Sequence, residues 1–297
     1  MYRYLALACT VLLATTLYGQ EPAPADTAAP KPWTLSHKLT VTFNQSAFSE
    51  NWQAGGVDAL GLGAVYNGKY DYKQGDWEWL NELIFEYGIQ RNEGQGSRKT
   101  LDRIFYDTKV AYRFSTDWLF YGSLNFLSQF DAGFAFGTDA GGQETRTLIS
   151  RYFAPAFVTE SFGLEYKPVD YFWARFGAGT VRQTLVLADG VYNGAPIVFG
   201  VPFGEDIRWE VGFQLTSEFD RAIAENVNLK ARFNAFANYE TIEAVDTRLD
   251  LALTAKVNKW LGVGVVAVGL HDNDQDPDVQ WSQNLLITFS LIDTAQK

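Results

Sequence analysis

The chain has a single cysteine, Cys9, and it lies inside the first apolar segment of the sequence. Once that segment is removed, no cysteine is left for a disulfide, a thiolate zinc site or thiol catalysis. The fold must therefore be stabilised in another way, such as by the closure of a β-sheet.

Long apolar runs and excess positive charge are also missing. No run reaches the roughly 18 apolar residues that a membrane-spanning helix needs, and the mean hydropathy of -0.14 is too polar for a bundle of such helices. The 24 Lys and Arg residues are outnumbered by 35 Asp and Glu, giving a net charge of -11. This balance argues against nucleic acid as a partner.

The N-terminus has the pattern of an export signal. A short basic start precedes an apolar stretch over residues 5–17, and Tyr18-Gly19-Gln20 offers a small residue for cleavage. We predict a secretory signal peptide over residues 1–20. Residues 21–32 are rich in Pro and Ala and are predicted to be a disordered periplasmic tether. Residues 33–297 are left for the folded domain.

The segment from Trp77 to Ile89 alternates strictly between two kinds of side chain. One parity is aromatic or aliphatic, and the other carries Glu78, Glu82 and Glu86. A period of two is typical of a β-strand with two different faces. The segment is long for a soluble strand but matches a tilted strand that crosses a membrane.

Similar patterns predict about twelve strands along the chain. They are expected near residues 34–43, 57–72, 77–89, 101–114, 117–130, 155–168, 170–180, 206–219, 226–239, 246–258, 260–270 and 281–291. The fold class that follows is all-β, a closed antiparallel up-and-down transmembrane barrel.

The gaps between these strands alternate in length. Short turns are expected at 73–76, 115–116, 168–169, 220–225 and 258–259, and longer loops at 44–56, 90–100, 131–154, 181–205, 240–245 and 271–280. Short periplasmic turns with long extracellular loops are the pattern of bacterial outer-membrane barrels. We therefore expect the outer membrane of a Gram-negative bacterium, contact with its lipid, and both termini in the periplasm.

Tryptophans lie at the predicted strand ends, where an interfacial aromatic girdle belongs. A soluble barrel would bury its apolar face instead, and tryptophans would then only cap its core. The strand length, the loop rhythm and the export signal favour the membrane. The expected girdle consists of Trp77, Trp118, Trp173, Trp209, Trp260 and Trp281.

A series of short motifs, in this order, resembles a known family. They are Asn51 to Gly56, Tyr66-Asn67, Tyr70, residues 77–88, Asp102 to Ile104, Asn125-Phe126, Gln129-Phe130, Ala154 to Ala156, Glu165 to Pro168, Phe199 to Val201 and Phe236 to Tyr239. The order resembles the exported Bacteroidota family catalogued as domain of unknown function 3078, over nearly the whole mature chain. The resemblance implies an outer-membrane barrel and no assigned reaction.

Charged residues on the polar parity of the strands are the first candidates for a functional site. They face the lumen if the apolar face meets lipid, and a barrel of this size has a narrow lumen. They either form a salt-bridged plug or line a selective pore. The set is Glu78, Glu82, Glu86, Arg103, Lys109, Arg113, Arg208, Glu210, Lys230, Arg232, Arg248 and Asp250.

An acidic run in the last predicted loop is the second candidate. Asp272, Asp274, Asp276 and Asp278 alternate with other residues, and such carboxylates could supply oxygen ligands to Ca²⁺. The run lacks the glycine and the distal glutamate of an EF-hand loop. The competing interpretation is a solvated acidic loop tip. No other cofactor is expected.

A third candidate is lipid hydrolysis, which one twelve-stranded outer-membrane phospholipase carries out with serine and histidine. Here His271 could meet Ser282 on the next strand, but no third, orienting group is evident. We expect no catalytic residues and no enzyme.

Apolar side chains in loop 181–205 indicate that this loop plugs the barrel or packs on a partner. Together these patterns favour a narrow or plugged channel for small solutes. The main alternative is a non-catalytic scaffold that binds a protein partner through loops 131–154 and 181–205, and a lipid hydrolase is a distant third.

Overall fold

The structure, a computed structural model, describes residues 32–46, 58–92, 94, 96–272 and 276–296. The predicted signal peptide and nearly all of the predicted tether lie outside these residues, so both stay predictions. None of the helices in the described part of the chain is long and apolar enough to cross a membrane.

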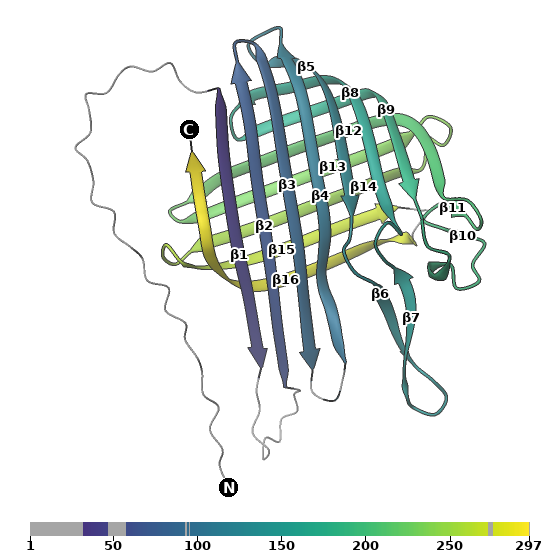
Figure 1. Ribbon diagram of the computed structural model, residues 1–297. Helices are drawn as coiled ribbons and strands as arrows, with labels where there is room; N and C mark the ends of the chain where they lie inside the picture. The colour runs from purple at the N-terminus through teal and green to yellow at the C-terminus, as the bar shows by residue number, and fades with distance from the viewer. Residues whose placement is uncertain (1–31, 47–57, 93, 95, 273–275, 297) are drawn as a thin grey trace. The chain divides into compact units, whose positions relative to one another are not determined.

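Twelve long strands close into an antiparallel barrel, which confirms the predicted fold class. The first strand, β1, pairs with the last, β16, and closes the sheet (Figure 1). Closure leaves no strand with an unpaired edge, as a membrane interior requires. In chain order the strands are β1 (Trp33–Ser46), β2 (Ala59–Gln74), β3 (Trp77–Asn92), β4 (Ser97–Arg113), β5 (Trp118–Ser128), β8 (Ala156–Val169), β9 (Phe172–Leu185), β12 (Ile207–Ala224), β13 (Val227–Asn238), β14 (Val245–Lys256), β15 (Leu261–Asp272) and β16 (Asp276–Gln296).

The two ends of the barrel differ in their connections. One end, here called the turn end, carries tight turns such as Gly75-Asp76 and Glu225-Asn226, where Gly75 and Asn226 adopt positive φ angles. Strand β1 begins and β16 ends at this same end. The opposite end, the loop end, carries the long connection between β5 and β8 and that between β9 and β12.

Two predicted loops are largely strand. Strands β3 and β4 pair as far as Arg91 and Ser97, inside the loop expected at 90–100. Strands β15 and β16 pair as far as Asp272 and Asp276, inside the loop expected at 271–280. Both segments are polar on both parities. Their composition therefore resembles a loop, although the backbone continues the sheet.

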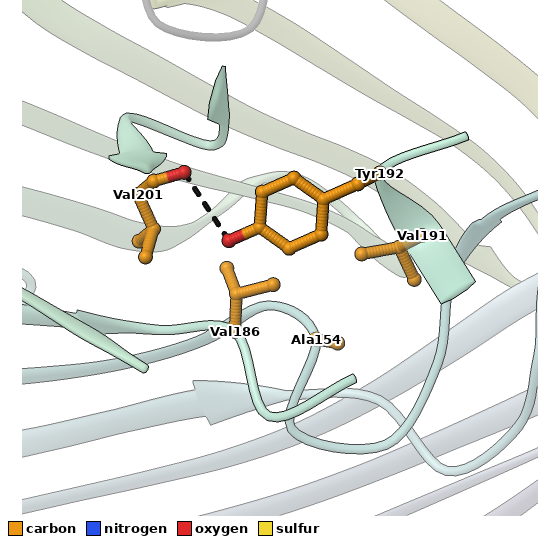
Figure 2. Packing of buried hydrophobic residues seen from close by; sticks show 5 residues of the cluster. All are labelled: Ala154, Val186, Val191, Tyr192 and Val201. Carbon is orange, nitrogen blue, oxygen red and sulfur yellow. Dashed lines mark hydrogen bonds between the residues drawn. The ribbon is translucent and has the colours of Figure 1, made fainter. Parts of the chain in front are cut away.

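The two long connections contain small elements of their own. One holds the hairpin of β6 (Gly133–Thr138) and β7 (Glu144–Ser150), and the other holds a 3-10 turn, η1 (Asp189–Val191), and the short strands β10 (Ile197–Val198) and β11 (Val201–Pro202). Figure 2 shows the small apolar core, here called the loop core, that joins the two connections. It consists of Ala154, Val186, Val191, Tyr192 and Val201.

The loop core shows where part of loop 181–205 packs, whereas the predicted plug stays a prediction. The Tyr192 hydroxyl donates to the Val201 carbonyl oxygen at 3.2 Å, and burial raises the pKa of this hydroxyl. Leu148 packs against the same cluster. Four side chains of the loop, those of Val186, Val191, Tyr192 and Val201, are therefore buried with Ala154 of the neighbouring connection.

Apolar and charged side chains separate onto the two faces of the barrel wall. Trp77 and Trp79 are exposed on the outside of β3, whereas Glu78 between them is buried inside. Of the predicted girdle, Trp77, Trp118 and Trp260 are exposed near the turn end. Trp209 and Trp281 are exposed near the loop end.

Trp173 is a correction to the predicted girdle. It pairs with Glu218 on β12, and its ring lies 4.2 Å from the guanidinium carbon of Arg175 inside the barrel. Aromatic residues occupy both parities around it, at Tyr171 and Phe172. The sequence pattern therefore did not show whether Trp173 faces the lipid or the lumen. Its position next to a turn was not sufficient evidence for contact with lipid.

Candidate lumen site

Ion pairs cross the lumen from one wall of the barrel to the other. The guanidinium of Arg232 on β13 lies 3.2 Å from a carboxylate oxygen of Glu82 on β3 and 3.3 Å from one of Asp107 on β4. In the ring of twelve strands β3 is six strands from β13 in either direction. The Arg232–Glu82 pair therefore spans the full width of the lumen at this level.

The most buried ion pairs lie next to this bridge. The Lys109 ammonium lies 2.6 Å from Glu165, and the two side chains are 2% and 1% exposed. Arg175 donates from Nε to Glu165 at 2.9 Å and from Nη1 to Asp107 at 3.2 Å. Each of these four buried charges has a partner of opposite sign, as burial in a low-dielectric interior requires.

Further pairs extend this group, here called the cross-lumen network, toward the turn end and around the wall. Glu78 lies 2.9 Å from Arg113 and 3.9 Å from Lys109. Lys230 lies 3.6 Å from Glu82 and 3.5 Å from Glu218. The network consists of Lys69, Glu78, Glu82, Asp107, Lys109, Arg113, Glu165, Arg175, Glu218, Lys230 and Arg232.

A cavity of about 260 Å³ lies in the lumen between the network and the loop end. Asp107, Arg175 and Arg232 belong to both the network and the cavity wall, so the network forms the floor. The remaining wall combines charged, polar and aromatic side chains and includes no residue of the loop core. A small polar solute fits a space of this size and lining.

Ion pairs also line the wall of the cavity. Arg182 on β9 binds Glu210 at 3.0 Å and also pairs with Asp246 on β14. Arg248 donates from Nε and Nη2 to the two oxygens of Asp250, at 2.8 and 2.7 Å. These pairs hold the wall together without filling the space.

Arg103 differs from the other cations of the cavity wall. Among the described residues it makes no ion pair, and its Nε is buried without a hydrogen-bond partner. Its guanidinium lies over the ring of Phe105, with 4.6 Å between the guanidinium carbon and the ring centroid. Glu86 faces it across the strand pair, but no ion pair joins them.

The register of the sheet decides which of the predicted lumen charges meet. It places Lys230 and Arg232 on β13 opposite Asp220 and Glu218 on β12. Arg208 and Glu210 instead pair with each other at 3.2 Å, nearer the loop end. Strand β12 is longer than predicted, so the pairing partners shift along it.

Sequence reasoning missed several of the most buried members. The predicted set left out residues on β8 and β9, where glycine and aromatic residues occupy both parities, and single residues on β2, β4, β12 and β14. With the strand order known, the inward-facing positions of one strand show which positions of its neighbour also face inward. This would have identified the missed residues. The missed residues are Lys69, Asp107, Glu165, Arg175, Arg182, Glu218 and Asp246.

The described residues of the acidic run belong to strands and not to the predicted loop. Asp272 is buried at the end of β15 and pairs in register with Asp276. Asp274 lies outside the described residues, so a cation site there is untested. Within the described residues no group of three or more His, Cys, Asp or Glu side chains is arranged to hold a metal ion.

The serine and histidine considered for hydrolysis are not brought together. Ser282 pairs with Val268 on β15, whereas His271 lies three residues further along that strand and pairs with Thr247 on β14. Because side chains alternate faces along a strand, an offset of three places them on opposite faces of the wall. They cannot form a nucleophile–base pair in this register.

A closed barrel with an aromatic outer face and a charged interior defines the class of outer-membrane β-barrels. Residues 43–134 match the family model described as "Protein of unknown function (DUF3078)", which confirms the predicted resemblance over that part. Residues 166–292 match a second model, "Protein of unknown function, DUF481". The Bacteroidota origin stays a prediction.

Comparison with curated proteins gives no match. Among solved structures the chain is similar to the COG4313 outer membrane channel from Pseudomonas putida F1, with a TM-score of 0.41 and 10% identity over 91% of this chain and 100% of that one. It is also similar to the translocator domain of autotransporter NalP from Neisseria meningitidis, with a TM-score of 0.35 and 10% identity over 89% of each chain. A third is the Pseudomonas putida toluene transporter TodX, with a TM-score of 0.33 and 10% identity over 88% of this chain and 90% of that one.

Proposed function

We propose that the protein is an outer-membrane channel for small solutes and that the cross-lumen network holds it closed. The observation that carries this proposal is the contact of Arg232 with Glu82, because it joins opposite walls of the barrel. The turn end then faces the periplasm, as short turns do in such barrels. The loop end faces the outside.

The division of the lumen supports this function. A solute from outside would first reach the cavity, whose floor is Asp107, Arg175 and Arg232. Passage beyond the floor requires these ion pairs to separate. A polar network can do so by exchanging partners, since Arg232 already has three carboxylates within 4 Å.

Single-channel recording in planar bilayers tests the proposal. Arg232→Ala removes the bridge between the two walls, so we expect larger and more frequent conductance steps than in the wild-type protein. Arg221→Ala is the matched control, because Arg221 is exposed and contacts Tyr171 rather than the network. Its conductance should equal that of the wild type.

An absence of conductance in both the wild type and Arg232→Ala would contradict the channel. It would favour the alternative that the protein is a scaffold for a partner outside the cell. One observation supports that alternative. Leu187, Ile197 and Phe203 remain 51%, 56% and 61% exposed in the loop between β9 and β12. Cross-linking in native membranes through this loop would then identify the partner.

A further inference from the structure

One cation of the cavity wall interacts with carboxylates, those of Glu86 and Asp250, only beyond ion-pair distance. The other cations of the wall each have a carboxylate partner: Arg175 and Arg232 at Asp107, Arg182 at Asp246 and Arg248 at Asp250. Arg103 has no such partner among the described residues, and its Nε has no hydrogen-bond acceptor. A buried cation without an acceptor is costly, so this position favours a ligand that supplies one.

Apolar side chains lie beside this cation. Phe105 is two residues from Arg103 on β4 and pairs in register with Leu127 on β5, which in turn pairs with Phe157 on β8. All three line the cavity together with Arg103. The wall therefore offers a guanidinium next to an apolar row.

We propose that the cavity binds a small organic carboxylate, with its carboxylate on Arg103 and its apolar part on Leu127 and Phe157, since Phe105 is already covered by the guanidinium groups of Arg103 and Arg232. The planar guanidinium presents parallel N–H donors that match the two oxygens of a carboxylate. A cavity of about 260 Å³ has room for a carboxylate with a short apolar part. This inference rests on the proposed function in treating the cavity as the entry site for solute, and it adds the solute class.

Isothermal titration calorimetry of the detergent-solubilised full chain with sodium butanoate tests the site. We expect saturable binding by the wild type and a loss of about tenfold or more in Arg103→Gln, since a charge-assisted hydrogen-bonded pair is removed. Arg103→Lys keeps the positive charge but lacks the planar pair of N–H donors, so it should bind butanoate with intermediate affinity. Arg91→Gln, at an exposed arginine near the end of β3, is the matched control and should bind like the wild type.

Two further ligands define the chemistry. Butylammonium has the same apolar part with the opposite charge and should not bind. Inorganic phosphate carries negative charge without the apolar part and should bind more weakly than butanoate. If phosphate binds as tightly as butanoate, the apolar row has no role and the assignment to organic carboxylates is wrong.

Glu86 provides the sharpest counter-test, because it faces Arg103 across the strand pair. If Glu86 neutralises Arg103 in solution, Glu86→Gln should strengthen butanoate binding. No saturable binding by either the wild type or Glu86→Gln would overturn the proposal, and so would undiminished binding by Arg103→Gln. If butanoate binds but no network variant conducts, the proposal of a channel is wrong, whereas the proposed carboxylate site is still supported.

Discussion

The lumen differs between its turn half and its loop half in how much water its charged side chains can meet. In the turn half, Lys109 and Glu165 are 2% and 1% exposed. In the loop half, Arg248 and Asp250 keep 30% and 26% of their side-chain surface exposed. The same kinds of ion pair therefore fill one half and only line the other.

The presence of charged side chains alone therefore does not decide whether a barrel interior is closed. In the turn half the long side chains of opposite walls meet, as Arg232 and Glu82 do. In the loop half one pair, Arg248 with Asp250, stays on one strand. A pair across the lumen occludes it, whereas a pair along one wall leaves space for a solute.

The largest expected effect is on stability in the turn half. Glu165→Gln removes the carboxylate shared by Lys109 and Arg175 and leaves both cations buried with fewer partners. We expect the free energy of unfolding to fall by about 3 to 5 kcal/mol. Urea unfolding in lipid vesicles, followed by heat-modifiable electrophoretic mobility, measures this change. If the free energy of unfolding falls by less than is usual for an exposed ion pair, water reaches the network and the prediction is wrong.

A smaller effect is expected for the matching change in the loop half. Asp250→Asn leaves Arg248 without its carboxylate, but Arg248 can turn to water in the cavity. The free energy of unfolding should fall by about 1 kcal/mol or less, as for exposed ion pairs. The same urea titration compares the two variants. Equal losses for Asp250→Asn and Glu165→Gln would remove the distinction between the halves.

The smallest effect concerns which tryptophans meet lipid. Trp281 is 76% exposed on the outer face, whereas Trp173 lies inside against Arg175. Brominated lipids quench tryptophan fluorescence only on contact. We therefore expect Trp281→Phe to reduce the quenched fraction and Trp173→Phe to leave it unchanged. If the quenched fraction also falls in Trp173→Phe, Trp173 contacts lipid and belongs to the girdle after all.

Most of the fold could be predicted from local patterns. All twelve long strands were expected within a few residues of where they lie, because period-two alternation is a local property of the chain. The errors fall in polar segments such as 271–280, where both faces of the strand are hydrophilic. There the alternation disappears even though the backbone stays paired.

The candidate site could be predicted only in part. The parity of β3, β4, β13 and β14 indicates which charges face inward, but it gives no level along the barrel axis. Register decides that Arg232 lies opposite Glu218 and not beside Glu210. Closure of the sheet then decides that Arg232 also reaches Glu82, which is 150 residues away in the chain.

The alternating pattern of the chain was enough to predict a two-faced sheet with an aromatic side and a charged side. The pattern suffices because each strand presents one face to lipid and the other to the lumen. Each residue must therefore suit the face on which it lies, and this shows in the sequence. The three-dimensional arrangement was needed to show which charges meet, that one half of the lumen is bridged, and that Arg103 makes no ion pair within the described part of the chain. Those outcomes depend on shear and closure, which bring together residues far apart in the chain.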